Sequence, residues 1–267
     1  MKQTQEIEEV PVTAFRDGLK RAIGQLECRA SVLRAEGLKG ASRALFLAQL
    51  AKTGNRTVVV LTPDQNTGEA LLGDLKYFFH HGKTGGVPRF FPAWELLPYE
   101  HLSPLPEISG ERLEILYLLL KGKLPFLVVP IEAAMQCVIP RSELDKLTFP
   151  IARGETFERE LLEACLSENG YTRTSLVESH GEFSVRGDIV DIYPPASSNP
   201  LRVEFFDDTV ESIREFDISS QVSVNEIEAV EILPVREVCP TLGQRKEGVE
   251  KILKLAEEQR VERAGLK

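Results

Sequence analysis

Two runs of consecutive apolar residues constrain the fold of this 267-residue chain more than any other feature. Thr57–Leu61 (TVVVL) and Phe126–Val129 (FLVV) have the composition of strands that a parallel sheet buries on both faces. Segments with apolar residues at helical spacing surround these runs, at Ser42–Lys52, Gly68–Phe79 and Glu107–Lys121. This alternation predicts an α/β fold with a parallel sheet covered by helices.

The pattern changes near residue 147. A predicted amphipathic helix at 157–166 ends at Asn169-Gly170, a typical helix stop. The strands predicted after it are Thr174–His180, Glu182–Arg186, Asp188–Tyr193, Leu201–Phe206 and Val210–Phe216. A run of strands after a single helix indicates a small α+β domain. An apolar-alternating strand, Ile227–Leu233, then returns, and we expect it to join the sheet of the first domain before a last helix at 244–261.

The expected organisation is therefore a discontinuous first domain, residues 1–146 plus 226–267, with a second domain, residues 147–225, inserted into it. Hydrophobic residues make up 42% of the chain and charged residues 27%, as in ordinary globular proteins. The net charge of −9 and the lack of a dense Lys/Arg block argue against direct nucleic-acid binding. No apolar run approaches the ~20 residues that span a bilayer. The polar N-terminus does not look like a secretory signal, so we expect a cytoplasmic protein.

A turn with two glycines lies where a phosphate-binding loop would be expected, after a short apolar run at Ala30–Ala35. The Walker pattern is G-x-x-x-x-G-K-[ST], and residues 37–44 read GLKGASRA. Ser42 replaces the second glycine, Arg43 the lysine and Ala44 the magnesium-binding hydroxyl. The residues of this candidate degenerate loop are Gly37, Gly40, Ser42, Arg43 and Ala44. The pattern leaves two interpretations open: a nucleotide site that has lost its function, or a βα turn that was never such a site.

No arrangement of Ser/His/Asp or Cys/His residues has a recognisable catalytic signature, and the four cysteines show no CxxC spacing. We therefore expect no catalytic residues, no metal site and no cofactor. Asp207-Asp208 resembles a pair of catalytic carboxylates, but in hairpin spacing it is more typical of a turn.

The segment 201–206 places Arg202, Glu204 and Phe206 on one face of a strand, opposite three apolar residues. An aromatic side chain among charged neighbours has the composition of an interface anchor. From the strand alone, Phe206 could equally pack beneath a neighbouring loop.

The residues around this strand resemble a known family. The string GEFSVRGDIVDIYP at 181–194 and the string LRVEFFDDTVESIREFDISSQ at 201–221 are similar to the module shared by UvrB and the bacterial transcription-repair coupling factors (Mfd). Three further stretches resemble the coupling factors: FPAWELLPYEHLSP at 91–104, SGERLEILYLLL at 109–120 and VVPIEAAMQCVIP at 128–140. The resemblance covers roughly residues 15–240.

The resemblance implies a P-loop-like first domain with a degenerate loop and an inserted domain that binds UvrA, the damage-recognition ATPase. It implies that the UvrA contact involves Arg186, Arg202, Phe206 and Asp207, to which the strand pattern adds Glu204. RNA polymerase and DNA would be partners only of regions that this chain lacks, and the other domains of the full-length factor would be further partners. The alternative is a UvrB-like ATPase fragment, which would need a working phosphate loop.

Overall fold

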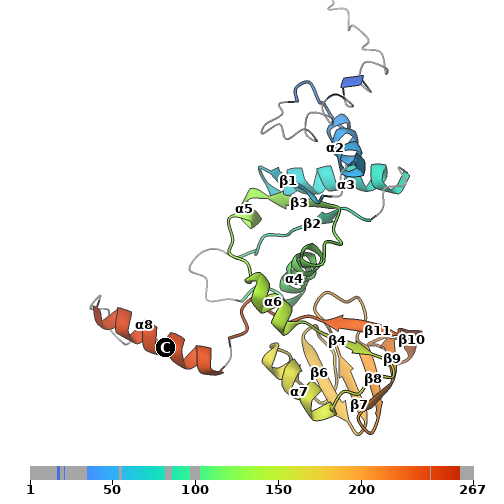
Figure 1. Cartoon of the computed structure of the whole chain (residues 1–267), viewed down its shortest axis with the longest axis vertical. Helices are drawn as coiled ribbons and strands as arrows, with labels where there is room; N and C mark the ends of the chain where they lie inside the picture. The colour runs from blue at the N-terminus through green and yellow to red at the C-terminus, as the bar shows by residue number, and fades with distance from the viewer. Residues whose placement is uncertain are drawn as a thin grey trace, which may run out of the picture. The chain divides into compact units, whose positions relative to one another are not determined.

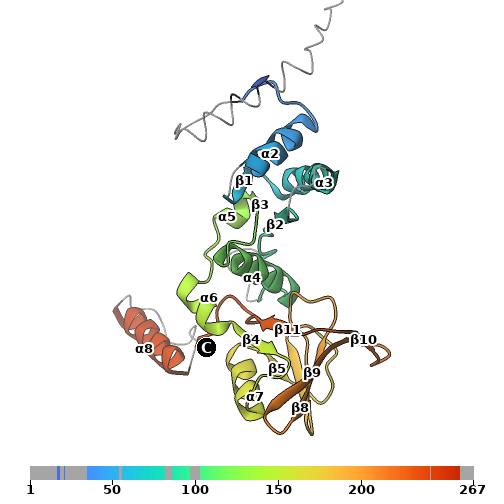
Figure 2. The same cartoon turned by 45° about the vertical axis from the view of Figure 1, so that its right-hand side comes forward.

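The computed structural model describes residues 17–18, 21, 35–53, 56–81, 86–96, 103–240 and 242–258, drawn in two views in Figures 1 and 2. The chain forms two compact units, Met1–Ala93 with Leu118–Gln136, and Trp94–Tyr117 with Cys137–Lys267. Parallel and antiparallel sheets occur together with helices, which confirms the predicted mixture of α and β structure.

The first unit is built on a three-stranded parallel sheet of order β1-β3-β2. Helices α2 and α3 pack on one face of this sheet, where Ala44, Leu75 and Phe126 are fully buried. Of the predicted strand at 30–35, all but Ala35 lies outside the described residues. The elements of this unit are α2 (Ser42–Thr53), β1 (Val58–Thr62), α3 (Gln65–His81), β2 (Arg89–Phe90), β3 (Phe126–Pro130) and α5 (Ile131–Ala134).

The two apolar strands of this sheet differ in burial. All five residues of β3 are buried, as predicted, because β3 is the central strand. In β1, however, Val59 is 53% exposed and Leu61 is 61% exposed. The prediction that this run is buried on both faces is therefore wrong. Helices α2 and α3 cover only the face that carries Val58 and Val60, which leaves Val59 and Leu61 on the other face of β1.

Helix α3 begins directly after β1 because Pro63 and Asp64 end the strand. The carboxylate of Asp64 accepts hydrogen bonds from the backbone N–H of Thr67, at 2.7 Å, and from its hydroxyl, at 3.0 Å. This is the usual way in which an aspartate satisfies the free N–H groups of a first helical turn. Gly68 then lets the helix approach the sheet closely, since a Cβ at this position would lie 2.8 Å from the ring of Phe90.

The second unit is built on a six-stranded sheet of order β10-β9-β8-β7-β6-β5, in which all neighbours are antiparallel except β5 and β6. Helix α7 packs its buried Leu162 and Leu166 on the inner face of this sheet, against Phe183, Val203 and Ile213. The sheet strands are β5 (Thr172–Arg173), β6 (Glu182–Arg186), β7 (Ile189–Ile192), β8 (Leu201–Phe206), β9 (Thr209–Phe216) and β10 (Ser223–Glu226). The other elements are the greater part of α4 (Pro106–Leu120), α6 (Arg141–Leu147), β4 (Phe149–Ala152), α7 (Arg159–Glu168), β11 (Ala229–Ile232) and α8 (Leu242–Glu258).

Helix α7 ends as predicted. Gly170 has a positive φ of 87°, and the backbone N–H of Tyr171 donates to the carbonyl oxygen of Leu166 at 3.0 Å. The strand predicted at 174–180 is wrong, because most of this segment is irregular and the short strand β5 lies before it. The backbone N–H groups of Glu178 and Ser179 donate to the side-chain carboxylate of Glu182. A side chain thus satisfies donors that a strand would give to a neighbouring strand.

The returning strand, β11, pairs with β4 and not with the sheet of the first unit, which corrects the expected pairing. The antiparallel register runs from Phe149 opposite Ile232 to Ala152 opposite Ala229. The chain therefore enters and leaves the stretch between β4 and β11 along two neighbouring strands.

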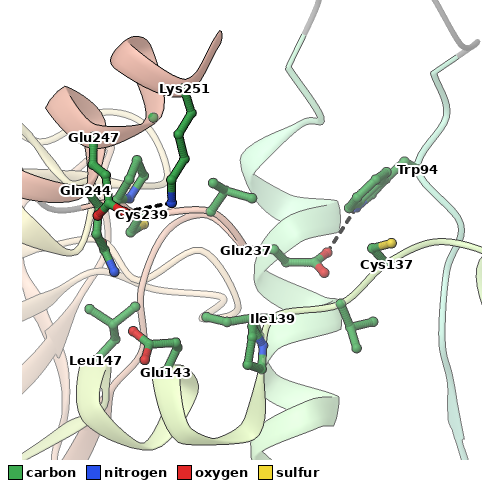
Figure 3. Close-up of a pocket in the computed structure, with 15 residues that line it drawn as sticks. Trp94, Cys137, Ile139, Glu143, Leu147, Glu237, Cys239, Gln244, Glu247 and Lys251 are labelled. Atoms are coloured by element: carbon green, nitrogen blue, oxygen red, sulfur yellow. Dashed lines mark hydrogen bonds and ion pairs between the residues drawn. The ribbon is translucent and has the colours of Figure 1, made fainter. Parts of the chain in front are cut away.

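A buried ion pair joins α4 to the segment after β11. The guanidinium of Arg112, which is fully buried, pairs with the carboxylate of Glu237 and lies over the ring of Trp94, 5.0 Å from its centroid. The Trp94 indole also donates to Glu237 at 2.9 Å, the bond drawn as a dashed line beside Trp94 in Figure 3. Trp94 and Glu237 border a cavity of about 450 Å³, whose other walls are the segments 137–140 and 238–240 and residues of α6 and α8, among them Leu147 and Lys251 (Figure 3).

Candidate protein-binding surface

The face of the six-stranded sheet opposite α7, hereafter the outer face, carries charged side chains of neighbouring strands side by side. The register sets Asp191 of β7 opposite Arg202 of β8, and Arg202 opposite Arg214 of β9. Glu204 lies opposite Ser212 in the same way. Residues directly opposite in an antiparallel pair share a face and lie within contact distance. The charges therefore form a continuous row across three strands.

Asp191 lies at the β7 end of this row. Its side chain is 1% exposed, and both oxygens accept hydrogen bonds from arginines. Arg202 donates from Nε to Oδ1 at 2.7 Å and from Nη2 to Oδ2 at 3.0 Å, and Arg186 donates from Nη2 to Oδ2. The bond to Asp191 raises the pKa of the Arg202 guanidinium above its ordinary value, although partial burial acts in the opposite direction.

Arg202 also covers the aromatic ring of Phe216. The guanidinium carbon lies 4.4 Å from the ring centroid, and Phe216 is fully buried. Two further contacts, at 3.5 and 3.3 Å, join Arg202 to the carbonyl oxygen and the side-chain oxygen of Gln221. With 16% of its side chain exposed, Arg202 is mainly part of the sheet's own packing.

A second ion pair continues the row on β8 and β9. Arg214 donates to the carboxylate of Glu204 at 2.6 Å, and the hydroxyl of Ser212 donates to the same oxygen at 2.8 Å. The side chains of Arg214 and Glu204 are 37% and 25% exposed, so both groups remain within reach of a partner.

Phe206 lies at the end of β8, where the strand meets its hairpin turn. The register between β8 and β9 shifts between Glu204 and Phe205, which marks a β-bulge. Phe205 is buried in the core, whereas Phe206 is 70% exposed. Of the two alternatives that the strand pattern leaves open, the structure thus places Phe206 at the surface. Asp207 follows in the turn with a positive φ of 52°, as expected for Asp207-Asp208 in a hairpin turn.

The structure brings the predicted residues Arg186, Arg202 and Glu204 together on the outer face, with Phe206 and Asp207 at its end. Sequence reasoning missed Asp191 and Arg214. Alternation along each strand assigns both to the polar face, but the sequence does not give the register, and only the register shows which charges meet.

The residues of the candidate phosphate loop lie in the first unit. Gly37 and Gly40 have positive φ values of 79° and 53°, and a Cβ at either would meet nothing within 4 Å. Ser42 begins α2 and its hydroxyl donates to the carbonyl oxygen of Lys39 at 2.7 Å. Arg43 is exposed, whereas Ala44 is fully buried in the helix–sheet core. The methyl group of Ala44 therefore faces the protein interior.

Among the residues that the structure describes, no three His, Cys, Asp or Glu side chains gather as metal ligands would. Within those same residues, none of the helices has the length and apolar character required to cross a bilayer.

Comparison with known proteins gives two results. Residues 149–237 match the UvrB interaction domain, a span that contains the whole outer face. The curated relatives include three proteins named transcription-repair-coupling factor. The chain is 39% identical over 212 residues to the one from Myxococcus xanthus, 34% over 200 residues to the one from Escherichia coli K12, and 32% over 217 residues to the one from Bacillus subtilis 168.

These three alignments cover 78%, 75% and 81% of the chain, but only 18%, 17% and 18% of the relatives. The chain thus spans less than a fifth of the length of the relatives it matches. The chain therefore belongs to the family of the transcription-repair-coupling factors, and its residues 149–237 are similar to the UvrB interaction domain.

Proposed function

We propose that this chain is a non-catalytic module of a transcription-coupled DNA repair factor, and that its outer face recruits UvrA. The observation that carries the proposal is Phe206, which is 70% exposed at the end of a strand inside the UvrB interaction domain. A large aromatic side chain left in water beside charged groups is the usual anchor of a protein interface. The neighbouring residues Arg186, Glu204 and Asp207 then form its charged surround.

The charge of the outer face supports a protein partner with acidic groups. Arg186 and Arg214 are 47% and 37% exposed on this face, so both guanidinium groups can reach acidic groups of a partner. Local complementarity of this kind steers association and selects partners. A complementary surface would offer acidic groups to the arginines, a basic group to Asp207 and an apolar pocket to Phe206.

The domain organisation stays part of this proposal: residues 147–225 as an inserted domain, and residues 1–146 with 226–267 as the domain that contains it. The β4–β11 ladder supports it, because the two strands lie side by side where the chain enters and leaves the stretch.

A degenerate phosphate loop is the second part of the proposal. The exposed Arg43 and the buried Ala44 occupy the positions of the lysine and the magnesium-binding hydroxyl of the Walker pattern. Without these groups the loop lacks the contacts that position ATP and Mg²⁺. A UvrB-like ATPase fragment is the alternative, and nucleotide binding separates the two. Contacts with RNA polymerase or DNA would belong to the regions of the longer relatives that this chain does not span.

The test of the proposed function is binding of purified UvrA to the whole chain and to Phe206→Ala. We expect the substitution to weaken binding by about 2 kcal/mol or more, mainly through faster dissociation. The matched control is Leu161→Ala, because Leu161 is 52% exposed but lies on α7, which covers the opposite face of the sheet. The control should bind UvrA as the wild type does. Equal affinities of Phe206→Ala and wild type would refute the assigned surface, and no binding by the wild type would refute the function.

A further inference from the structure

We propose that Asp191 is the positioning residue of the outer face, which holds Arg186 in the orientation that meets an acidic group of the partner. This inference rests on the proposed function, because it assigns roles within the same surface. It divides the two arginines that Asp191 binds into one that contacts the partner and one that supports the contact.

The first step is the burial of Asp191. Its side chain is 1% exposed, and a buried carboxylate is stable only when cations or hydrogen-bond donors compensate its charge. Arg202 and Arg186 supply that compensation, from a strand on either side of β7. The carboxylate is therefore held between the neighbouring strands and cannot turn toward solvent without breaking its ion pairs with both arginines.

The second step is the difference between the two arginines. Arg202 donates hydrogen bonds to Asp191 and Gln221, lies over the ring of Phe216, and is 16% exposed. Arg186 is 47% exposed, and its one hydrogen-bond partner among the described residues is Asp191. Since a guanidinium has five N–H donors in a planar fork, Arg186 keeps an unused edge for a second carboxylate.

The third step is what such an anchor does for binding. A long side chain loses conformational freedom when it is immobilised in an interface, and an arginine already held in place loses less. Asp191 also separates the positive charges of Arg186 and Arg202, which would otherwise repel each other. The outer face thus offers an acidic partner a cation whose position is set before the partner arrives.

The test is a double-mutant cycle on the whole chain with UvrA as the partner. Arg186→Ala and Asp191→Asn should each weaken binding about tenfold or more. The double variant should bind within about twofold of Arg186→Ala, because Asp191 acts through Arg186 and has nothing to position once that side chain is gone. A merely structural role of Asp191 predicts the opposite, a further loss in the double variant, and that result would overturn the proposal.

The matched control is Glu163→Gln. Glu163 lies on α7, on the opposite side of the sheet, and pairs with Arg173 at 2.7 Å, so this variant removes a carboxylate from an arginine without touching the outer-face row. It should leave UvrA affinity unchanged. Circular dichroism of every variant checks that the sheet is folded.

A second measurement uses only the wild-type chain, so it does not depend on whether a variant folds. In the free wild-type chain, the side-chain nitrogen signals of Arg186 in an NMR spectrum should report restricted rotation of the guanidinium. Signals that show free rotation of this guanidinium would overturn the inference, whatever the affinities of the variants. The two failures can be told apart: no binding by the wild type refutes the proposed function, whereas normal binding with additive variants or a freely rotating Arg186 refutes only the role of Asp191.

Discussion

The guanidinium of Arg202 lies edge-on to the carboxylate of Asp191, with hydrogen bonds of 2.7 and 3.0 Å that use both oxygens. The two residues face each other across β7 and β8, so the register of the sheet and the ion pair fix each other. This pairing makes Arg202 a structural residue first, although the resemblance to the coupling factors points to it as a contact residue.

Arg202→Glu should destabilise the second unit by about 3 kcal/mol, because it removes the main partner of a buried carboxylate and sets a like charge against it. This loss of stability is small for the removal of one partner from a buried ion pair, because Arg186 still binds Asp191. Arg202→Lys should cost less, as it keeps the charge but loses the two-pronged geometry. Urea denaturation measures both variants, and a midpoint for Arg202→Glu equal to that of the wild type would contradict the prediction.

Glu237→Ala should destabilise the second unit by about 3–5 kcal/mol, because it leaves the fully buried guanidinium of Arg112 without its carboxylate. Trp94 is the only tryptophan of the chain, so its emission should also shift when the bond to Glu237 is lost. The control is Glu143→Ala, whose side chain is 39% exposed and pairs with Lys146 at the surface. That variant should stay within about 0.5 kcal/mol of the wild type. Equal costs for the two variants would show that burial of the pair is unimportant.

Tyr171→Phe should cost about 1 kcal/mol at neutral pH, since the buried Tyr171 hydroxyl donates to the carbonyl oxygen of Leu233 at 2.9 Å. Burial raises the pKa of Tyr171 above its ordinary value. The neutral phenol therefore stabilises the fold below the unfolded-state pKa of about 10, and this contribution is lost as the pH rises further. The advantage of the wild type over Tyr171→Phe should shrink above that pH. Unfolding free energies measured from pH 7 to 11 test this, and a constant difference would exclude it.

Mg-ATP should not bind this chain, so calorimetry should detect no heat of binding. No phosphate should be released on prolonged incubation. The physical reason is the replacement of the phosphate-binding lysine by Arg43 and of the magnesium-binding hydroxyl by the buried Ala44. A micromolar dissociation constant would instead favour the UvrB-like ATPase.

Local pattern in the sequence predicts the element types well where a single element decides them. The end of α7 at Asn169-Gly170 and the turn at Asp207-Asp208 follow from residue chemistry alone. The burial of a strand and its pairing partner do not follow from local residue chemistry. Val59 looks like a core residue but is 53% exposed, because the helices cover the other face of β1. The strand of residues 229–232 pairs with β4 in a register that no local pattern contains.

The candidate site shows the same division. Alternation along β8 puts Arg202, Glu204 and Phe206 on one face, and the resemblance to the family singles out Arg186 and Asp207. Neither source identifies Asp191 as the group that joins the two arginines, because a cross-strand contact depends on residues that are distant in sequence.

The β4–β11 ladder also determines how tension along the chain would act on this module. The strands are antiparallel, and Phe149 and Ile232 form the pair nearest both exits of the chain. A pull on the two exits acts along the hydrogen bonds of that pair, so the ladder should open like a zipper, one pair at a time, and not slide in shear. The contacts of Leu233 with Tyr171 and of Val235 with Asn169 lie just outside the ladder and would yield first. The six-stranded sheet lies inside the closed loop, so the two ends of that loop separate fully only when the last pair, Ala152 with Ala229, has parted.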